Sequence, residues 1–166
     1  MKKYILRLFI ILLFVAWACD HGLAPPGETG PSKPTGISGI IYYQNWPPQD
    51  SVLNLKLVVF NDYPPGDIVT EVLNGNAKAY PEDLADPLPY GVDTSHYQIE
   101  LAPRTYAYVV VAQQYGANLF ADWRAVGQYD ATPQDSLPTS VTVIKDSVIS
   151  GINIYVNFDS LPPQPF

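Results

Sequence analysis

The sequence predicts an all-β fold, a seven-stranded antiparallel sandwich of two sheets that carries one short helix. Apolar side chains recur at every second position through most of residues 36–158, which is the period of a half-buried strand. Proline, glycine, asparagine and aspartate interrupt these runs at the short intervals typical of a sandwich. The chain of 166 residues has the length of one domain with short extensions.

The first two strands are expected over residues 36–43 and 51–60. Because side chains alternate between the two faces of a strand, the second strand should present Asn54 and Lys56 to solvent. The side chains expected to point into the core from these two strands are Ile37, Ile41, Tyr43, Leu53, Leu55, Leu57 and Val59.

Five further strands are expected over residues 96–102, 105–114, 123–129, 139–144 and 149–158. Residues 105–114 are apolar on both faces, which indicates a central strand. In the first and last of the five, alternation places one set of side chains in the core: Tyr97, Ile99, Leu101, Ile152, Ile154, Val156 and Phe158.

The segment between Phe60 and His96 is too long for a bare loop in a compact domain. Residues 67–74 are expected to form its short helix, with Asp67 as N-cap and Gly75 just past the end. Residues 79–91 hold three prolines and should form a surface excursion. Its carboxylates at Glu82, Asp83 and Asp86 are an alternative calcium site, but the glycine and spacing of a calcium loop are absent. We interpret them as a solvated acidic loop.

The chain begins with a basic stretch, Lys2, Lys3 and Arg7, followed by an apolar run over residues 8–18. This pattern is typical of a secretory signal peptide over residues 1–18, with cleavage between Ala18 and Cys19. A proline- and glycine-rich tether over 19–35 precedes the domain at 36–160, and 161–166 form a proline-rich tail.

Cys19 is the only cysteine of the chain, so it cannot form an internal disulfide. Residues 1–19 resemble the start of a bacterial lipoprotein, in which a cysteine at this place is acylated and becomes the mature N-terminus. That resemblance implies a cell-envelope protein on the exported side of a membrane, held there by acylated Cys19. Secretion with a free thiol and an uncleaved anchor are the alternatives.

Residues 97–112 read YQIELAPRTYAYVVVA, an alternating strand, a turn and a second strand. They resemble the signature hairpin of carboxypeptidase-regulatory-like and transthyretin-like sandwiches, with Pro103 and Tyr106 at the positions of the family's turn proline and tyrosine. Arg104 stands where glycine is usual. The resemblance implies an immunoglobulin- or transthyretin-like sandwich and a non-catalytic, accessory role.

The formal charge is −7, and removal of residues 1–18 takes away three basic residues and no acidic ones, which leaves −10. This balance argues against a nucleic-acid partner. The only histidines are His21 and His96, too few for a zinc site. Ser95 and His96 are neighbours on a strand and should face opposite sides, which argues against a catalytic pair, although a triad with an aspartate is the alternative. We expect no enzyme, no cofactor and no metal.

Aromatic side chains are the unusual feature of the composition, with twelve tyrosines and three tryptophans. Loop aromatics can anchor a protein interface or stack on sugar rings. We expect a non-enzymatic structural or interaction role with an envelope protein, and the alternative is a carbohydrate-binding lipoprotein. The candidate contacts are Trp46, Tyr63, Tyr80, Tyr90 and Trp123, with Tyr115 and Phe120 in neighbouring loops.

Overall fold

The computed structural model describes residues 33–132 and 137–165. Contacts divide the chain into two units, Met1–Ser32 and Lys33–Phe166. All described strands and helices belong to the second unit. The expected signal peptide, its cleavage site at Ala18 and most of the tether lie outside the described residues.

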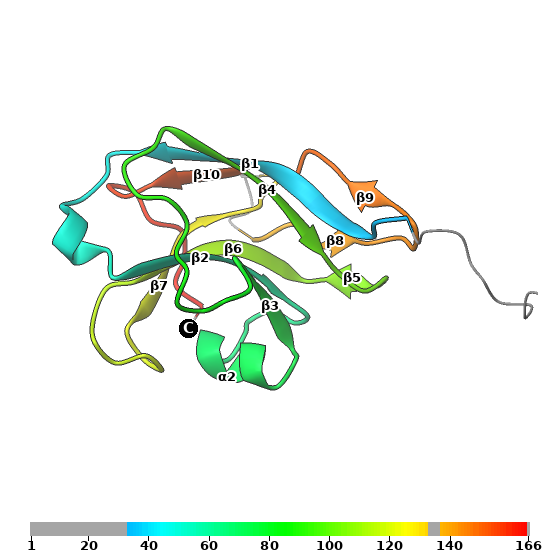
Figure 1. Cartoon of the computed structure of the whole chain (residues 1–166), viewed down its shortest axis with the longest axis horizontal. Coiled ribbons are helices and arrows are strands. Elements are labelled where there is room, and N and C mark those ends of the chain that lie inside the picture. The colour runs from blue at the N-terminus through cyan, green and yellow to red at the C-terminus, as the bar shows by residue number, and fades with distance from the viewer. Residues whose placement is uncertain (1–32, 133–136, 166) are drawn as a thin grey trace, which may run out of the picture. The chain divides into compact units, whose positions relative to one another are not determined.

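One layer of the sandwich is a sheet of four strands (Figure 1). β1 (Gly36–Gln44) lies between β4 (Thr94–Glu100) and β10 (Ile154–Asn157), and β9 (Val148–Ile149) also pairs with β1. β4 is antiparallel to β1, whereas β9 and β10 are parallel to it. They run parallel because the chain reaches β9 at the end of the sheet where β1 begins, as the bond from Gly36 N to Ser147 O shows (3.0 Å).

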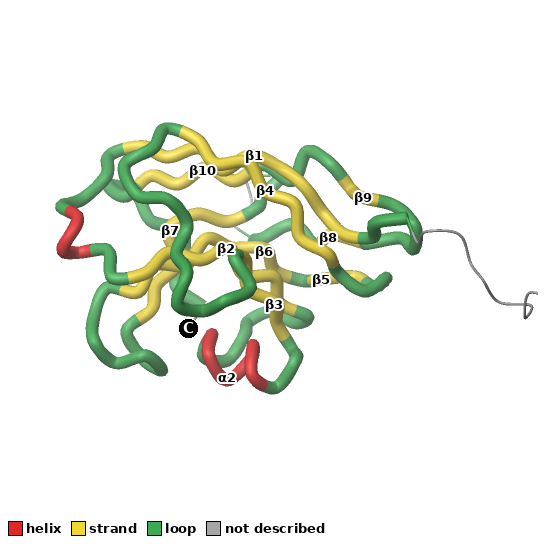
Figure 2. The backbone as a smooth tube through the Cα atoms, in the orientation of Figure 1, coloured by secondary structure: helices red, strands yellow, loops and turns green. Residues whose placement is uncertain are grey.

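The other layer is an antiparallel sheet in the order β3-β2-β6-β7. Its strands are β2 (Asn54–Phe60), β3 (Ala77–Tyr80), β6 (Tyr108–Gln114) and β7 (Trp123–Gln128). A short ribbon joins β5 (Thr105–Tyr106) to β8 (Val141–Thr142), and a 3-10 turn, η1 (Gln49–Ser51), precedes β2. Figure 2 shows strands in both layers with loops between them. The predicted all-β sandwich is therefore confirmed, with two parallel pairings that the sequence did not predict.

A hydrophobic core fills the space between the two sheets. The alternation predicted for residues 36–43, 96–102 and 149–158 is confirmed, because the expected core side chains of these strands are buried. Tyr106 is buried as well, and its hydroxyl donates to the Ala102 carbonyl at 3.1 Å. This bond crosses the turn between β4 and β5, like that of a corner tyrosine in an antiparallel sandwich.

A second hydrophobic cluster covers the outer face of the β3-β2-β6-β7 sheet. The predicted helix contributes to it: α2 (Ile68–Leu73) is capped by Asp67, whose side chain accepts from Thr70 N at 2.9 Å. Gly75 follows the helix with a φ of +76°, a left-handed conformation that favours glycine. The members of this cluster are Val58, Phe60, Ile68, Ala77, Tyr108, Val110, Ala112, Trp123 and Ala125.

Because this sheet is buried on both faces, two predictions for residues 51–60 are wrong. Lys56, expected in solvent, has an exposed fraction of 0%. Leu53, expected in the core, is 53% exposed. It lies in the loop just before β2, which begins at Asn54. The prediction from alternating residues assumed that one face of this strand is exposed to solvent. In the structure, the segment between β2 and β4 covers the outer face of β2.

The two ends of the domain also differ from their predicted boundaries. Thr35, assigned to the tether, accepts from Leu101 N at 3.0 Å and from Asp146 N at 2.8 Å. The C-terminal segment, expected as a tail, packs Leu161 against the inner core. The side-chain amide of Gln164 bonds to the backbone of Ala125. It accepts from the Ala125 N–H at 2.9 Å and donates to the Ala125 carbonyl at 3.0 Å. The last residues therefore cover the free edge of β7.

Candidate functional site

The loops farthest from Lys33 hold two of the sequence-predicted aromatic contacts, Trp46 and Tyr90, together with their neighbours Tyr115 and Phe120. β1 carries the chain from the end of the sandwich where Lys33 lies to the opposite end, and Trp46 follows two residues after it (Figure 1). We call residues 45–53, 87–93 and 115–122 the far-end loops. A nine-residue strand spans about 30 Å, so the sandwich separates these loops from Lys33.

Trp46 is the centre of an aromatic cluster in the far-end loops. Its ring lies 4.8 Å from Tyr43, 4.8 Å from Tyr90 and 4.7 Å from Phe158, measured between ring centroids. The indole N–H donates to the Val92 carbonyl at 2.8 Å. Trp46 is therefore half-buried and held by neighbours on several sides, and only part of its surface is available to a ligand.

A shallow pocket of about 290 Å³ lies beside Trp46. Its lining is mostly apolar and includes Trp46, Leu53, Leu88 and Tyr90. The Tyr90 hydroxyl donates to the Pro47 carbonyl at 2.6 Å, which ties two of the far-end loops together. A pocket of this kind suits an apolar side chain better than a polar small molecule.

The other predicted aromatic contacts lie elsewhere. Trp123 is buried in the outer cluster, and its indole N–H donates to the Leu119 carbonyl at 2.8 Å. Tyr63 packs edge-on against Tyr108 in the same cluster, and the Tyr80 ring lies beside Tyr97 at the inner core. Trp46 and Trp123 thus belong to different clusters and form no common platform.

Sequence reasoning missed part of the exposed apolar surface of the far-end loops. Leu53 had been assigned to the core, and Leu119 had not been singled out; both side chains are exposed. Tyr115 and Phe120, named as neighbours of the predicted contacts, are exposed as well. The Arg124 guanidinium lies over the Tyr115 ring, 5.6 Å from its centroid. Such exposed apolar side chains mark an interaction surface when they gather on one part of a protein.

Lys56 holds the excursion that leads to the far-end loops. Its ammonium donates to the carbonyls of Pro81, Asp83 and Asp86, the first at 3.1 Å. Nearby, the Asn54 amide donates to the Leu84 carbonyl at 2.8 Å. The burial of Lys56 lowers its pKa, and the carboxylates of Asp86 and Asp83 partly offset that effect.

For the acidic residues of this segment the sequence predicts a solvated loop, with a calcium site as the alternative. The side chains of Glu82, Asp83 and Asp86 are exposed, but the backbone carbonyls turn inward to the lysine. Among residues 33–132 and 137–165, no three His, Cys, Asp or Glu side chains gather as a metal-binding group.

Ser95 and His96 face opposite sides of β4, as expected. Ser95 is buried and His96 is exposed. The Ser95 hydroxyl lies beside that of Tyr43, where burial raises the tyrosine pKa to about 12 and the serine partly offsets the rise. The Ser95 hydroxyl therefore lies in the protein interior, whereas the His96 imidazole lies at the surface.

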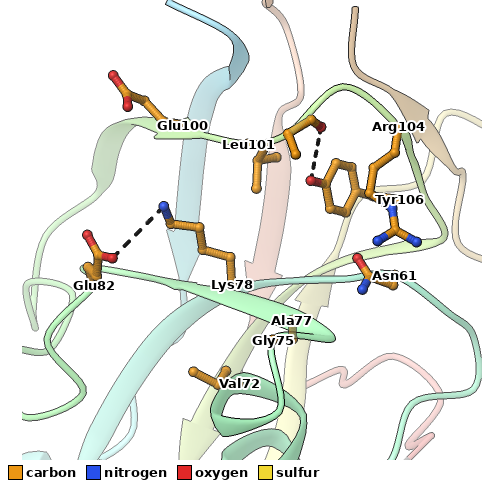
Figure 3. A pocket seen from close by; sticks show the side chains of 11 residues that line it. Asn61, Val72, Gly75, Ala77, Lys78, Glu82, Glu100, Leu101, Arg104 and Tyr106 are labelled. Carbon is orange, nitrogen blue, oxygen red and sulfur yellow. Dashed lines mark hydrogen bonds and ion pairs between the residues drawn. The ribbon is translucent and has the colours of Figure 1, made fainter.

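A second concavity, of about 410 Å³, opens on the side of the sandwich between β3 and β4 (Figure 3). Lys78 and Glu82 form an ion pair at 4.0 Å on its rim. Figure 3 shows Glu100 pointing away from the concavity. A neighbouring concavity of about 420 Å³ shares Lys78, Glu82 and Glu100, so the two form one groove along the edges of both sheets.

Comparison with protein-family models, with curated proteins and with solved structures finds no match to this chain. Cys19 lies outside the described residues. In the part of the chain that the structure describes, no helix is both long enough and apolar enough to cross a membrane.

Proposed function

We propose that this chain is a lipid-anchored, non-enzymatic protein of the bacterial cell envelope that binds another envelope protein through its far-end loops. The anchor rests on the sequence, which places the single cysteine directly after an apolar segment that follows three basic residues. Because two or three acyl chains each bury many methylenes, at about 0.8 kcal/mol apiece, such an anchor holds a protein on a membrane.

The observation that carries the interaction role is the position of the exposed apolar side chains. Among the described residues, five of the nine large hydrophobic side chains that are exposed belong to loops at the end of the sandwich opposite Lys33: Leu53, Tyr90, Tyr115, Leu119 and Phe120. An anchor at Cys19 joins the domain at Lys33, so the opposite end is the one that a tethered domain can present to a partner.

Carbohydrate binding is the second candidate, and the aromatic geometry favours it less. A sugar ring needs a flat, exposed aromatic face. The Trp46 ring is flanked by Tyr43, Tyr90 and Phe158, and Trp123 is buried. A protein surface, which offers single side chains to a shallow apolar pocket, suits this geometry better.

The anchor is tested by the intact mass of the mature protein and by fractionation of the Cys19→Ala variant. We expect an acylated N-terminal cysteine in the wild type and release of the variant from membranes. An unmodified cysteine would contradict the anchor and leave plain secretion.

The interaction role is tested by photo-crosslinking from Leu53 in living cells, with a crosslinker at Thr142 as control. We expect one protein adduct from Leu53 that disappears in the Tyr90→Ser background and does not form from Thr142. A glycan panel probed with residues 20–166 should give no signal. Specific glycan binding without a protein adduct would favour the second candidate.

A further inference from the structure

The free edge of β4 carries an unused row of backbone hydrogen-bonding groups. Along the shared ladder, Leu101 N donates to Thr35 O at 3.0 Å and Tyr43 N donates to Asp93 O at 2.9 Å. Alternate residues of an antiparallel strand bond to opposite sides, so the odd-numbered residues of β4 bond to β1. The amides and carbonyls of His96, Gln98 and Glu100 therefore point away from β1, where β4 has no partner among the described strands.

The molecule covers the free edge of β7 but not this one. Gln164 occupies the edge of β7 at Ala125, and β10 lies so close that a Cβ on Gly127 would come within 2.7 Å of Tyr155 O. β4 is seven residues long and contains no proline, glycine or bulge. A strand edge of this length without such protection is a template for pairing with another strand.

The sequence along this edge is complementary to itself. His96, Gln98 and Glu100 are all exposed on the outer face of the sheet, at every second position. If a second copy of β4 runs antiparallel with Gln98 opposite Gln98, each His96 faces the partner's Glu100. A shift of one residue, centred on Tyr97, would put His96 opposite Gln98 and remove the pairing of each imidazole with a carboxylate of the partner.

We propose that two copies of this chain associate through their β4 edges, antiparallel and centred on Gln98. The contact is isologous, as in most two-fold dimers. Three facing pairs exchange two bonds each, which gives about six backbone hydrogen bonds. The contact joins the β10-β1-β4 sheets of both copies into one continuous sheet, and it lies beside the groove of Figure 3. This proposal is independent of the anchor and of the far-end loops.

Introducing a carboxylate at position 96 tests the register. The protein used is residues 20–166, which contain the whole compact unit Lys33–Phe166 and both hydrophobic clusters. Sedimentation equilibrium should show a concentration-dependent dimer. His96→Glu places like charges opposite each other twice and should raise the dissociation constant about tenfold or more. His96→Glu combined with Glu100→Lys should restore the wild-type dissociation constant.

Cysteine pairing gives a second measurement of the same contact. Residues 20–166 contain no cysteine, so Gln98→Cys introduces the only thiol. Facing residues in a hydrogen-bonded pair lie about 5.5 Å apart at Cα, within disulfide range. Mild oxidation should link Gln98→Cys into a covalent dimer, and Thr142→Cys, exposed on β8, should stay monomeric.

Three results would overturn the proposal. The first is a protein that stays monomeric up to about 1 mM, since a specific interface binds far more tightly than that. The others are a dimer whose dissociation constant His96→Glu leaves unchanged, and a disulfide-linked dimer that forms through Thr142→Cys but not through Gln98→Cys. Circular dichroism of each variant confirms folding, which these exposed positions should not disturb.

Discussion

Lys56 shows how one residue can organise a long excursion. Its side chain passes from the middle of β2 to three carbonyls of the segment that follows β3. A buried ammonium is stable only when its donors are satisfied, and the three carbonyls satisfy all of them. Leu88 follows Asp86 by two residues, and its N–H donates to the Leu55 carbonyl at 2.8 Å. This bond brings the chain back to β2. The lysine therefore fixes the path that leads to Pro89 and Tyr90.

Replacing Lys56 by methionine should destabilise the domain by about 3 kcal/mol, because three carbonyls lose a charged donor while the apolar stem keeps its packing. Lys78→Met is the matched control: its ion pair with Glu82 is exposed and 4.0 Å long, so its loss should cost less than about 0.5 kcal/mol. Urea unfolding of both variants measures the difference. Equal midpoints would mean that the carbonyls around Lys56 are satisfied in another way.

The central strand β6 contributes side chains to both hydrophobic clusters. Val109 and Val111 face the inner core, and Tyr108, Val110 and Ala112 face the outer cluster. The sequence predicted this directly, because residues 105–114 are apolar on both faces. It could not predict which elements cover the outer face, since that depends on where the excursion between β2 and β4 folds back.

Val110→Asp should abolish folding. Val110 lies opposite Val58 and Gln128 and is fully buried, so the aspartate would be an unpaired charge in the outer cluster. That costs several kcal/mol, a large part of the roughly 5–15 kcal/mol that stabilises a typical domain. Thr94→Asp, exposed on β4, is the control and should cost less than about 0.5 kcal/mol. Soluble yield and urea unfolding compare them, and a stable Val110→Asp protein would contradict the central position of β6.

At Gly39, β1 approaches the segment before β10 closely. A Cβ there would lie 2.1 Å from the Ile152 carbonyl oxygen, which accepts from the Tyr97 hydroxyl at 2.5 Å. Gly39→Ala should therefore push that carbonyl away and cost about 2 kcal/mol or more. Ser38→Ala, the neighbouring position on the outer face, should cost less than about 1 kcal/mol. Thermal unfolding measures the stability of the two variants. Equal melting temperatures for Gly39→Ala and Ser38→Ala would show that the backbone can shift to accommodate the methyl group.

For the whole molecule, the sequence predicted most of the inner core and only part of the candidate site. Core positions follow from a local period, which each strand carries by itself. The site depends on long-range geometry: Trp46 and Tyr90 meet across 44 positions of the chain, whereas Trp123 is drawn into the outer cluster. The pairing of β9 and β10 with β1 likewise depends on how the chain passes from one sheet to the other. No local sequence pattern predicts that path.

Buried tyrosines give the whole domain a limit at alkaline pH. Burial raises the pKa of Tyr43 to about 12, and burial also raises the pKa of Tyr97 and of Tyr108. In the unfolded chain a tyrosine ionises near its ordinary pKa of about 10, so these groups stabilise the fold fully below that pH. Each then costs about 1.4 kcal/mol of stability per pH unit until its folded pKa is reached. Lys56, whose pKa is lowered, acts in the opposite direction below its ordinary value of about 10.4.

We therefore expect cooperative unfolding between about pH 10 and 12, because three such groups remove up to about 4 kcal/mol per pH unit from a stability of roughly 5–15 kcal/mol. Far-ultraviolet circular dichroism and tyrosinate absorbance, followed on the same samples, should change together as the buried hydroxyls ionise. Tyr108→Phe should move the midpoint to higher pH without loss of stability at pH 7, since the Tyr108 hydroxyl is buried with no hydrogen-bond partner among the described residues. Complete tyrosine ionisation with an intact circular dichroism spectrum would show that the three hydroxyls reach solvent in the folded state.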